Sequence, residues 1–338
     1  MITAVLSADR QGIMEAARII RKGGLAVFPT ETVYGLGADA QNEAAVGRIY
    51  TVKGRPNDNP LILHISDKSL FYSYTENIPD YFTALSDAFW PGPMTVVAFK
   101  KSSVPGWGTA GLPTIAIRMP SLEAARQLIE YAQTPIYAPS ANLSGKPSPT
   151  NIRHVLQDLD GKVDIVLDGG PCIYGLESTV VDISGHIPRI LRPGFITADM
   201  ICRQLGIYPE TEYLVDKPKS PGMKYKHYSP KAELVVIVGA PENTAALINE
   251  RAAKTEKRIG ILATNQTIKK YDPNKYLVLN AGDRLSPECI GAGLFAALRA
   301  FDEGGVDVIY AEGIAETGVG AAVMNRITKA AGGRVINI

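Results

Sequence analysis

Two stretches organise the fold of this chain: FPTETVYGLG at residues 28–37 and KGRPNDNP at residues 53–60. Ahead of the first, the apolar run 25–28 predicts a short buried strand, which Pro29 ends. Hydroxyls and glycines follow at once, as happens where a strand ends and small polar groups face a ligand. After the second, residues 61–65 predict another buried strand. The chain therefore contains a strand–helix–strand unit whose loops are unusually polar and unusually stiff.

The helix of this unit is predicted to begin at Asn42 and to stop at Gly54. Two cations, Lys53 and Arg55, stand at its end. An arbitrary pair of cations there would be a solvated helix end that complements the helix dipole. The next five residues are two prolines, two asparagines and an aspartate, which stiffen the chain beside the charges. This composition favours a preorganised anion site.

Bulk composition places the chain among ordinary globular proteins, with 46% hydrophobic and 20% charged residues in a chain of 338. The net charge of +1 gives no general attraction to nucleic acid or to acidic membranes. The three cysteines are isolated, which indicates neither a zinc site nor a disulfide framework and suggests a reducing compartment. The first residues lack the apolar core of a signal peptide, and no apolar run is long enough to span a membrane. We therefore expect a cytoplasmic protein.

Strand and helix patterns divide the chain into three parts. Residues 1–207 interleave strands and helices, starting with a helix that Ser7 would cap. Several strands there follow one another directly, which favours a mixed, twisted sheet with flanking helices. Residues 208–232 lose all periodicity and are typical of a linker or an ordered lid. Residues 233–338 alternate strands and helices again, which predicts a smaller α/β domain with a parallel sheet.

Polar groups recur in the first part where predicted strands end. They are Thr32, Arg55, His64, Arg118, Ser140, Asn142, Ser178 and Arg192. Groups at strand ends can converge on one crevice, and ligands favour such crevices. Lys53, Arg55 and Arg192 together could surround a triphosphate. Singly, each has a simpler interpretation: a salt bridge for Arg192, turn chemistry for Ser140 and Asn142, and a satisfied strand histidine for His64.

Three ordered motifs together resemble the YrdC-like family. They are Thr30-Glu31-Thr32-Val33-Tyr34-Gly35-Leu36, then Lys53-x-Arg55-Pro56 with Asn59-Pro60-Leu61, and Pro139-Ser140-Ala141-Asn142-x-Ser144-Gly145. With the linker SPGMKYKHYSP at residues 220–230, the whole chain is similar to the two-domain form of this family, the threonylcarbamoyl-AMP synthases. The resemblance implies an N-terminal YrdC-like twisted mixed sheet with flanking helices. It also implies a linker that folds over the active site and a smaller C-terminal Rossmann-like α/β domain.

The resemblance implies a nucleotidyltransferase. Members of the family combine L-threonine, bicarbonate and ATP into threonylcarbamoyl-AMP and pyrophosphate. The product supplies the threonylcarbamoyl group for the adenosine next to the anticodon of certain tRNAs. We expect transient handover of the product to the tRNA threonylcarbamoyl transferase machinery, weak direct contact with tRNA, and no membrane partner.

Residue roles follow from the resemblance by motif position. The residues that would hold L-threonine are Thr32, His64, Arg118, Ala138 and Ser178, with Arg118 as the partner of the carboxylate. The residues that would contact ATP are Arg55, Asn59, Thr114, Ser140, Asn142, Ser148 and Arg192, with His227 and Tyr228 as linker candidates. Lys53 and Arg55 would be the catalytic cations near the phosphates. The family's linker often has arginine where this chain has Lys226, which puts a bidentate contact there in doubt.

The implied chemistry needs no covalent enzyme intermediate and no obligatory general base. Catalysis would consist of positioning and charge neutralisation by cations and by Mg²⁺ that accompanies ATP, without protein metal ligands. A closed linker would protect the labile adenylate from water.

Two motif-like features are expected to be structural. The run Gly291-Ala292-Gly293 mimics a dinucleotide fingerprint, but it lies within a helix pattern and does not follow a strand, which favours tight helix packing. Asn325 and Arg326 are likewise expected to be structural. No P-loop motif is present as an alternative ATP site.

Two other functions remain as alternatives at this point. The first is an RNA-binding module, which the low net charge disfavours. The second is carbamoyl-adenylate synthesis from carbamoyl phosphate by a related domain of hydrogenase maturation proteins. Those proteins carry zinc-finger cysteine pairs, and this chain has none. Pyrophosphate release that depends on threonine separates the three functions.

Overall fold

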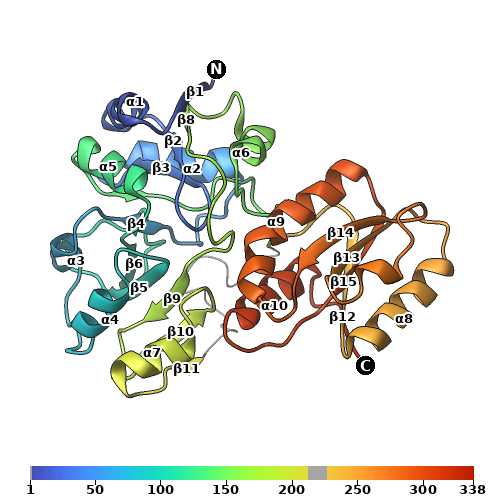
Figure 1. Cartoon of the computed structure of the whole chain (residues 1–338). Coiled ribbons are helices and arrows are strands. Elements are labelled where there is room, and N and C mark those ends of the chain that lie inside the picture. The colour runs from blue at the N-terminus through green and yellow to red at the C-terminus, as the bar shows by residue number, and fades with distance from the viewer. Residues whose placement is uncertain (1, 212–226) are drawn as a thin grey trace. The chain divides into compact units, whose positions relative to one another are not determined.

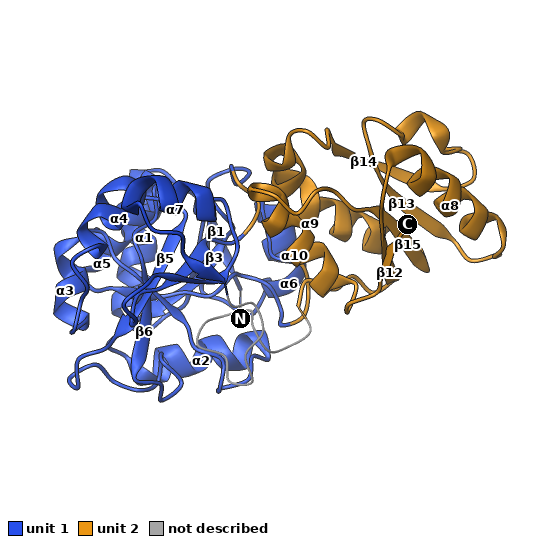
Figure 2. Ribbon diagram, turned by 90° about the horizontal axis from the view of Figure 1, so that it is seen from below, with its two compact units in different colours: residues 1–144, 148–173, 177–225 blue, residues 145–147, 174–176, 226–338 orange. Residues whose placement is uncertain are grey.

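The computed structural model describes residues 2–211 and 227–338, and these residues form two compact units (Figure 2). Unit 1 contains residues 2–144, 148–173 and 177–211. Unit 2 contains residues 227–338 together with two short segments from the first part of the sequence, 145–147 and 174–176. Much of the predicted linker, including Lys226, lies outside the described residues.

Unit 1 is built on an eleven-stranded mixed sheet with the order β1-β8-β2-β3-β7-β4-β6-β5-β9-β10-β11 (Figure 1). The predicted mixed sheet is therefore confirmed. The strands are β1 (Ala4–Ser7), β2 (Ala26–Phe28), β3 (Gly35–Asp39), β4 (Ile62–His64), β5 (Met94–Phe99), β6 (Thr114–Arg118), β7 (Ile136–Tyr137), β8 (Ile165–Asp168), β9 (Thr179–Asp182), β10 (Arg189–Arg192) and β11 (Glu210–Thr211).

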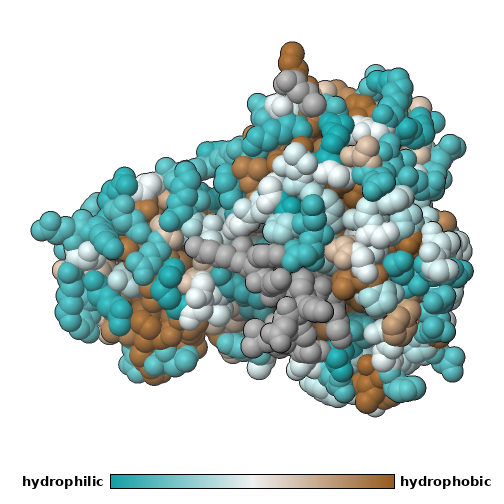
Figure 3. Space-filling view, turned by 180° about the vertical axis from the view of Figure 1, so that it is seen from behind, coloured by the Kyte–Doolittle hydropathy of each residue, from teal (hydrophilic) through white to brown (hydrophobic). Residues whose placement is uncertain are grey.

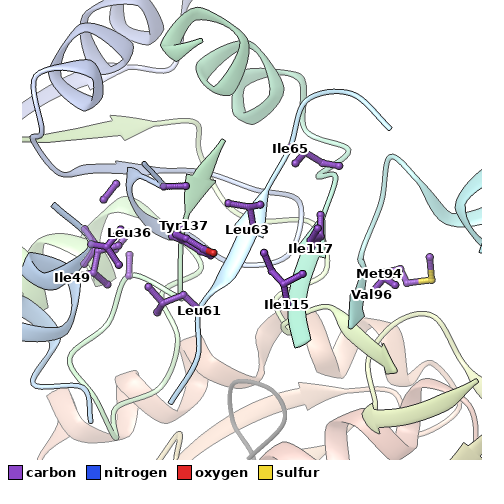
Figure 4. Close-up of a cluster of buried hydrophobic side chains, with 14 of the residues drawn as sticks. Leu36, Ile49, Leu61, Leu63, Ile65, Met94, Val96, Ile115, Ile117 and Tyr137 are labelled. Carbon is purple, nitrogen blue, oxygen red and sulfur yellow. The ribbon is translucent and has the colours of Figure 1, made fainter. Parts of the chain in front are cut away.

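Helices cover both faces of this sheet. They are α1 (Arg10–Arg21), α2 (Glu43–Lys53), α3 (Ser69–Tyr74), α4 (Phe82–Phe89), α5 (Glu123–Ala132), α6 (Ile152–Leu159) and α7 (Ala198–Leu205). Because side chains alternate along a strand, Ala26 and Phe28 pack on α1 and α5, whereas Val27 joins the core on the other face. Figure 4 shows side chains of that second core, among them Leu63 and Ile117 on neighbouring strands.

The capping residues of α2 determine where Lys53 and Arg55 lie. Asn42 caps α2, and its side chain accepts a hydrogen bond from the Ala45 amide at 3.1 Å. Gly54 ends the helix in the left-handed conformation at φ 59°, which favours glycine. Lys53 is thus the last helical residue and Arg55 opens the following loop, as predicted. For α1 the prediction was wrong: Ser7 ends β1, and Asp9 is the cap, accepting from the Gly12 amide at 3.0 Å.

Unit 2 is a five-stranded parallel sheet with the order β14-β13-β15-β12-β16, which confirms the parallel sheet expected there. Its strands are β12 (Glu233–Val238), β13 (Ile259–Thr264), β14 (Leu277–Gly282), β15 (Val308–Glu312) and β16 (Val335–Asn337). Its helices are α8 (Pro241–Ala253), η1 (Ile268–Lys270), α9 (Pro287–Gly304) and α10 (Val319–Ala330). In Figure 1, α9 and α10 lie together on one face of the sheet, and α8 lies on the other.

Over residues 2–211 and 227–338, no helix is long and apolar enough to cross a membrane. The face drawn in Figure 3 is mainly hydrophilic, with one larger apolar patch on unit 2 and smaller apolar groups elsewhere. The large apolar side chains that are exposed, such as Ile2, Ile173 and Leu285, come from separate parts of the chain.

Candidate active site

One edge of the unit 1 sheet collects polar side chains from strands that run in both directions. His64 ends β4 and Arg118 ends β6, and the two are register partners in a parallel pair. Thr95 of β5 faces Arg118 in the antiparallel pair β5–β6. Ser178 directly precedes β9, which is parallel to β5, and Arg192 ends β10, which is antiparallel to β9. These strand ends and strand starts therefore share an edge.

The Arg118 guanidinium is held by the loop that follows β2. Its Nη2 donates to Glu31 Oε1 at 2.6 Å, and its Nη1 donates to Thr32 Oγ1 at 2.8 Å. The side chains of Arg118 and Glu31 are 5% and 1% exposed. Burial acts to raise the pKa of the Glu31 carboxyl, but the Arg118 charge and hydrogen bond outweigh it, so the pKa lies below its ordinary value. Glu31 and Arg118 thus form a buried ion pair.

A second set of contacts surrounds Ser178. Its hydroxyl lies 2.7 Å from Thr95 Oγ1 and accepts from Arg192 Nη2 at 3.2 Å. Arg192 also donates from Nε and Nη2 to the Ser178 carbonyl at 3.1 and 3.0 Å. Gly194 must be small here, because a Cβ at that position would come within 2.4 Å of the Thr179 amide nitrogen. The turn after β10 therefore packs directly against the start of β9.

His64 is a neutral residue in this setting. Burial, and then the neighbouring Arg118 charge, lower the pKa of His64 to about 3. Its Nδ1 lies 3.1 Å from the Ile62 carbonyl, which can only accept, so Nδ1 carries the proton. The imidazole therefore adds no positive charge beside Arg118 near neutral pH.

Lys53 ties the end of α2 to the loop that contains the Pro-Ser-Ala-Asn motif. Its Nζ donates to the carbonyl oxygens of Ser140 and Asn142, and the Ser144 amide donates to the Lys53 carbonyl at 2.9 Å. The Ser140 hydroxyl donates to Asn142 Oδ1 at 2.5 Å. Lys53 as a whole is only 3% exposed. The buried Lys53 ammonium is thus held by the loop that contains the Pro-Ser-Ala-Asn motif.

The loop after α2 is braced by its own arginine. Arg55 Nη2 donates to Asn59 Oδ1 at 2.6 Å and to the Pro60 carbonyl at 2.8 Å, and its Nε donates to the Asn59 carbonyl at 3.1 Å. The stiffness predicted from the prolines is therefore reinforced by side-chain contacts. Thr114 begins β6 and is partly exposed, and Ala138 directly follows β7 and is buried.

Backbone hydrogen bonds of Tyr34 join the separate loops. The Tyr34 amide donates to the Pro149 carbonyl at 2.9 Å, and the Ala141 amide donates to the Tyr34 carbonyl at 2.8 Å. Ser148, next to Pro149, donates from its hydroxyl to Glu177 Oε1 at 2.5 Å. The loops 29–34 and 139–142 and the positions around Ser148 and Ser178 are thereby parts of one hydrogen-bonded assembly.

The two linker candidates belong to unit 2. Tyr228 is 5% exposed, has a left-handed backbone at φ 64°, and stacks on Phe295 of α9 with ring centroids 5.1 Å apart. The Arg326 guanidinium lies 5.7 Å from the centre of the Tyr228 ring, and the His227 ring lies 5.5 Å away. These contacts anchor the chain that leads out of the linker onto α9 and α10.

Sequence reasoning missed three residues of the unit 1 assembly: Glu31, Thr95 and Glu177. Glu31 and Glu177 each directly precede a predicted site residue in the sequence, and both are buried. The available signal was that a buried cation such as Arg118, or a buried hydroxyl such as that of Ser148, needs a hydrogen-bond partner. Thr95 lies inside an apolar strand pattern and carries no local signal. Among residues 2–211 and 227–338, no group of three or more His, Cys, Asp or Glu side chains is arranged to hold a metal ion.

The twisted mixed sheet of unit 1 and its cation-bearing strand ends define a YrdC-like α/β domain. Residues 18–194 match the Sua5/YciO/YrdC family, which is described as "Telomere recombination". Residues 196–332 match the family described as "Threonylcarbamoyl-AMP synthase, C-terminal domain". The chain belongs to the two-domain threonylcarbamoyl-AMP synthase family.

Relatives extend this similarity over the whole chain. A threonylcarbamoyl-AMP synthase of Bacillus subtilis is 47% identical over 339 residues, which cover 99% of this chain and 97% of the relative. One of Pyrococcus abyssi is 46% identical over 330 residues, with 96% and 95% coverage. A solved structure of P. abyssi Sua5 complexed with L-threonine superimposes with a TM-score of 0.92 at 44% identity, and covers 100% of this chain and 99% of that one.

Proposed function

We propose that unit 1 carries out the synthesis of threonylcarbamoyl-AMP from L-threonine, bicarbonate and ATP, for the modification of tRNA next to the anticodon. The observation that carries this proposal is the convergence of Arg118, Thr32, Ser178 and Arg192 at one sheet edge, in a chain similar over its full length to synthases of this name. The protein is then a nucleotidyltransferase that uses ATP as a substrate.

The first half of the proposed site takes L-threonine. Arg118 would bind the carboxylate: a guanidinium has five N–H donors, and contacts within the described residues take up three of them, including a 3.4 Å contact with the Gly92 carbonyl. Thr32 and Ser178 would contribute hydroxyls, and His64 and Ala138 would line the pocket. His64 is neutral near neutral pH, so it would line the pocket without adding positive charge beside Arg118.

The second half takes ATP. Lys53 and Arg55 would act as the catalytic cations at the phosphates, with Arg192 beside Ser178 linking the two halves. The remaining nucleotide contacts within unit 1 would come from Asn59, Thr114, Ser140, Asn142 and Ser148. The linker candidates His227 and Tyr228 stay predictions from the resemblance. Mg²⁺ would enter bound to the phosphates of ATP.

The reaction proceeds in two steps. The neutral amine of L-threonine attacks the bicarbonate carbon, and loss of water leaves a carbamate. A carbamate oxygen then attacks the α-phosphorus of ATP, the bond to the β-phosphate oxygen breaks, and pyrophosphate leaves. Buried cations lower the barrier of the second step by stabilising charge on the leaving pyrophosphate. Handover of the adenylate to the tRNA threonylcarbamoyl transferase machinery would follow.

The test is pyrophosphate release from ATP by the purified protein, with and without L-threonine and bicarbonate. We expect release that needs both small substrates and falls by at least about 100-fold in Lys53→Ala, as loss of a preorganised charge contact at a reacting phosphate implies. Lys68→Ala is the matched control, because Lys68 is a partly exposed lysine of unit 1 that pairs with Asp87.

Two other outcomes would each support one of the alternative functions. Release that needs carbamoyl phosphate in place of threonine and bicarbonate would support carbamoyl-adenylate synthesis. No release under any condition, together with salt-dependent binding of tRNA, would support an RNA-binding module.

A further inference from the structure

The backbone of the segment Lys146-Pro147-Ser148-Pro149 offers few groups that can form hydrogen bonds. Proline has no backbone N–H, so the two prolines on either side of Ser148 can be fixed only through their carbonyl oxygens. The Pro149 carbonyl accepts from the Tyr34 amide at 2.9 Å within unit 1. The Pro147 carbonyl accepts from Arg299 Nη2 at 2.6 Å within unit 2. Ser148 therefore lies between two carbonyls that are each anchored, one of them by helix α9.

Other contacts secure the same turn in unit 2. Gly145 has φ 91°, a left-handed conformation that favours glycine, and its carbonyl accepts from the Ser229 amide at 2.8 Å. Ser229 follows the anchored Tyr228, and its hydroxyl donates to the Ala330 carbonyl at 3.1 Å. The last glycine of the motif that contains Ser140 and Asn142 thus lies where the chain enters unit 2.

The second segment, 174–176, rests on small residues of the same helix. A Cβ on Gly175, which has φ 66°, would come within 2.4 Å of the Ala292 carbonyl oxygen, so the two backbones are in close contact. Leu176 is 4% exposed, and a Cβ on Gly291 would lie 3.0 Å from its Cδ1. The run Gly291-Ala292 is therefore a packing surface, in agreement with the helix-packing interpretation drawn from the sequence.

Both segments adjoin the Ser148–Glu177 hydrogen bond along the chain. Pro147 precedes Ser148, and Leu176 precedes Glu177, which is followed by Ser178. We propose that α9, through Arg299 and the Gly291–Ala292 surface, is a positioning element of the reaction centre. It fixes Pro147 and Leu176 and thereby the Ser148–Glu177 pair and the start of β9. This assigns a catalytic-support role to unit 2, and it rests on the proposed function of unit 1.

The experiment compares matched substitutions on α9. Arg299→Met removes the donor to Pro147 and keeps the apolar stem, and Arg299→Lys restores a donor. Gly291→Val pushes into Leu176, whereas Gly293→Val makes the same change two residues on, where a Cβ meets nothing within 4 Å. We expect kcat/KM for ATP to fall at least tenfold in Arg299→Met and in Gly291→Val, to recover in part in Arg299→Lys, and to stay within about twofold in Gly293→Val.

A second readout separates positioning from stability. Amide exchange of the peptide that contains residues 150–156 should be faster in Arg299→Met and in Gly291→Val than in Gly293→Val. Glu312→Gln, a destabilising change at the end of β15 in unit 2, should lower the unfolding midpoint without changing kcat/KM. If Arg299→Met and Gly291→Val lose stability but keep kcat/KM and exchange rates, α9 does not position the site.

The failure of the inference differs from failure of the proposed function. If the wild-type protein releases no pyrophosphate with L-threonine and bicarbonate, the function is wrong. If the wild type is active and all four α9 variants match it, the positioning role is wrong. Should Arg299→Met fail to fold, Arg299→Lys and the glycine pair decide the question alone.

Discussion

The two units differ in the groups that surround a buried carboxylate. In unit 2 the buried Glu312 carboxylate at the end of β15 accepts from four neutral donors, namely the Thr264 amide and hydroxyl and the hydroxyls of Thr267 and Tyr271. In unit 1 the buried Glu31 is matched by the buried cation Arg118, whose guanidinium also reaches Thr32. Both carboxylates lie at or near the end of a strand, but only one is paired with a full opposite charge.

This difference indicates what each arrangement is suited for. A carboxylate surrounded by neutral donors is satisfied by its own unit and stabilises it. A buried ion pair is weak evidence for stability, because desolvation of two charges offsets their attraction. A guanidinium kept in such a pair presents its other N–H donors in a fixed geometry, which is what a carboxylate-binding site needs. We therefore interpret the polar cluster around Glu312 as structural, and we propose that the cluster around Arg118 binds a carboxylate.

The largest expected effect comes from neutralising each carboxylate in turn. Glu31→Gln leaves Arg118 as a buried charge without its partner, and we expect about 3–5 kcal/mol loss of unfolding free energy and loss of threonine-dependent activity. Glu312→Gln keeps the shape and lets the hydroxyls of Thr267 and Tyr271 rotate, so we expect a loss of about 1–3 kcal/mol with kcat unchanged. Urea unfolding and pyrophosphate release measure the two quantities. Equal losses of activity in the two variants would remove the distinction between the units.

A smaller effect concerns the pH dependence of stability. The pKa of His64 is about 3 in the folded protein, below the ordinary value of about 6.5, so the unfolded chain binds the proton more tightly. The stabilisation is therefore fully present above pH 6.5 and is lost as the pH falls, at up to about 1.4 kcal/mol per pH unit. Between pH 6.5 and 5, wild type should lose up to about 2 kcal/mol more than His64→Gln.

The control for this measurement is His186→Gln, which removes an exposed imidazole of the same unit. Urea unfolding at several pH values gives the slopes for the three proteins. A wild-type slope identical to that of His64→Gln would mean that His64 is not held neutral by burial, and would weaken the account of the threonine pocket.

The smallest expected effect on activity compares two hydroxyls at strand ends. Ser178→Ala removes contacts with Thr95 and Arg192, and we expect about a tenfold fall in kcat/KM for L-threonine, equivalent to about 1.4 kcal/mol. Thr264→Ala removes a hydrogen bond to the Glu312 carboxylate and should lower stability by about 1.5–3 kcal/mol without changing kcat/KM. A loss of catalytic efficiency in Thr264→Ala would show that the polar cluster of unit 2 also supports catalysis.

Local signals were sufficient for the parts of the site that depend on near neighbours. The helix α2 and the cations at its end follow from Asn42 as cap and Gly54 as stop, both of which act within one turn. The end of β6 at Arg118 follows from an apolar run that a cation terminates, whereas β4 ends at His64, one residue before the end of the predicted strand 61–65. The edge strand β1 was missed, because its residues are all exposed and it is held only by pairing with β8, far along the chain.

The amino-acid sequence by itself determined the family motifs, the mixed character of the first sheet, the parallel sheet of the second part, and the polar residues at strand ends. Only the tertiary structure decided that Glu31 faces Arg118, that Thr95 faces Ser178, and that residues 145–147 and 174–176 belong to unit 2. The physical reason is separation along the chain. Capping, turns and periodicity act over a few residues, whereas strand order and contacts across a sheet join residues that no local pattern relates.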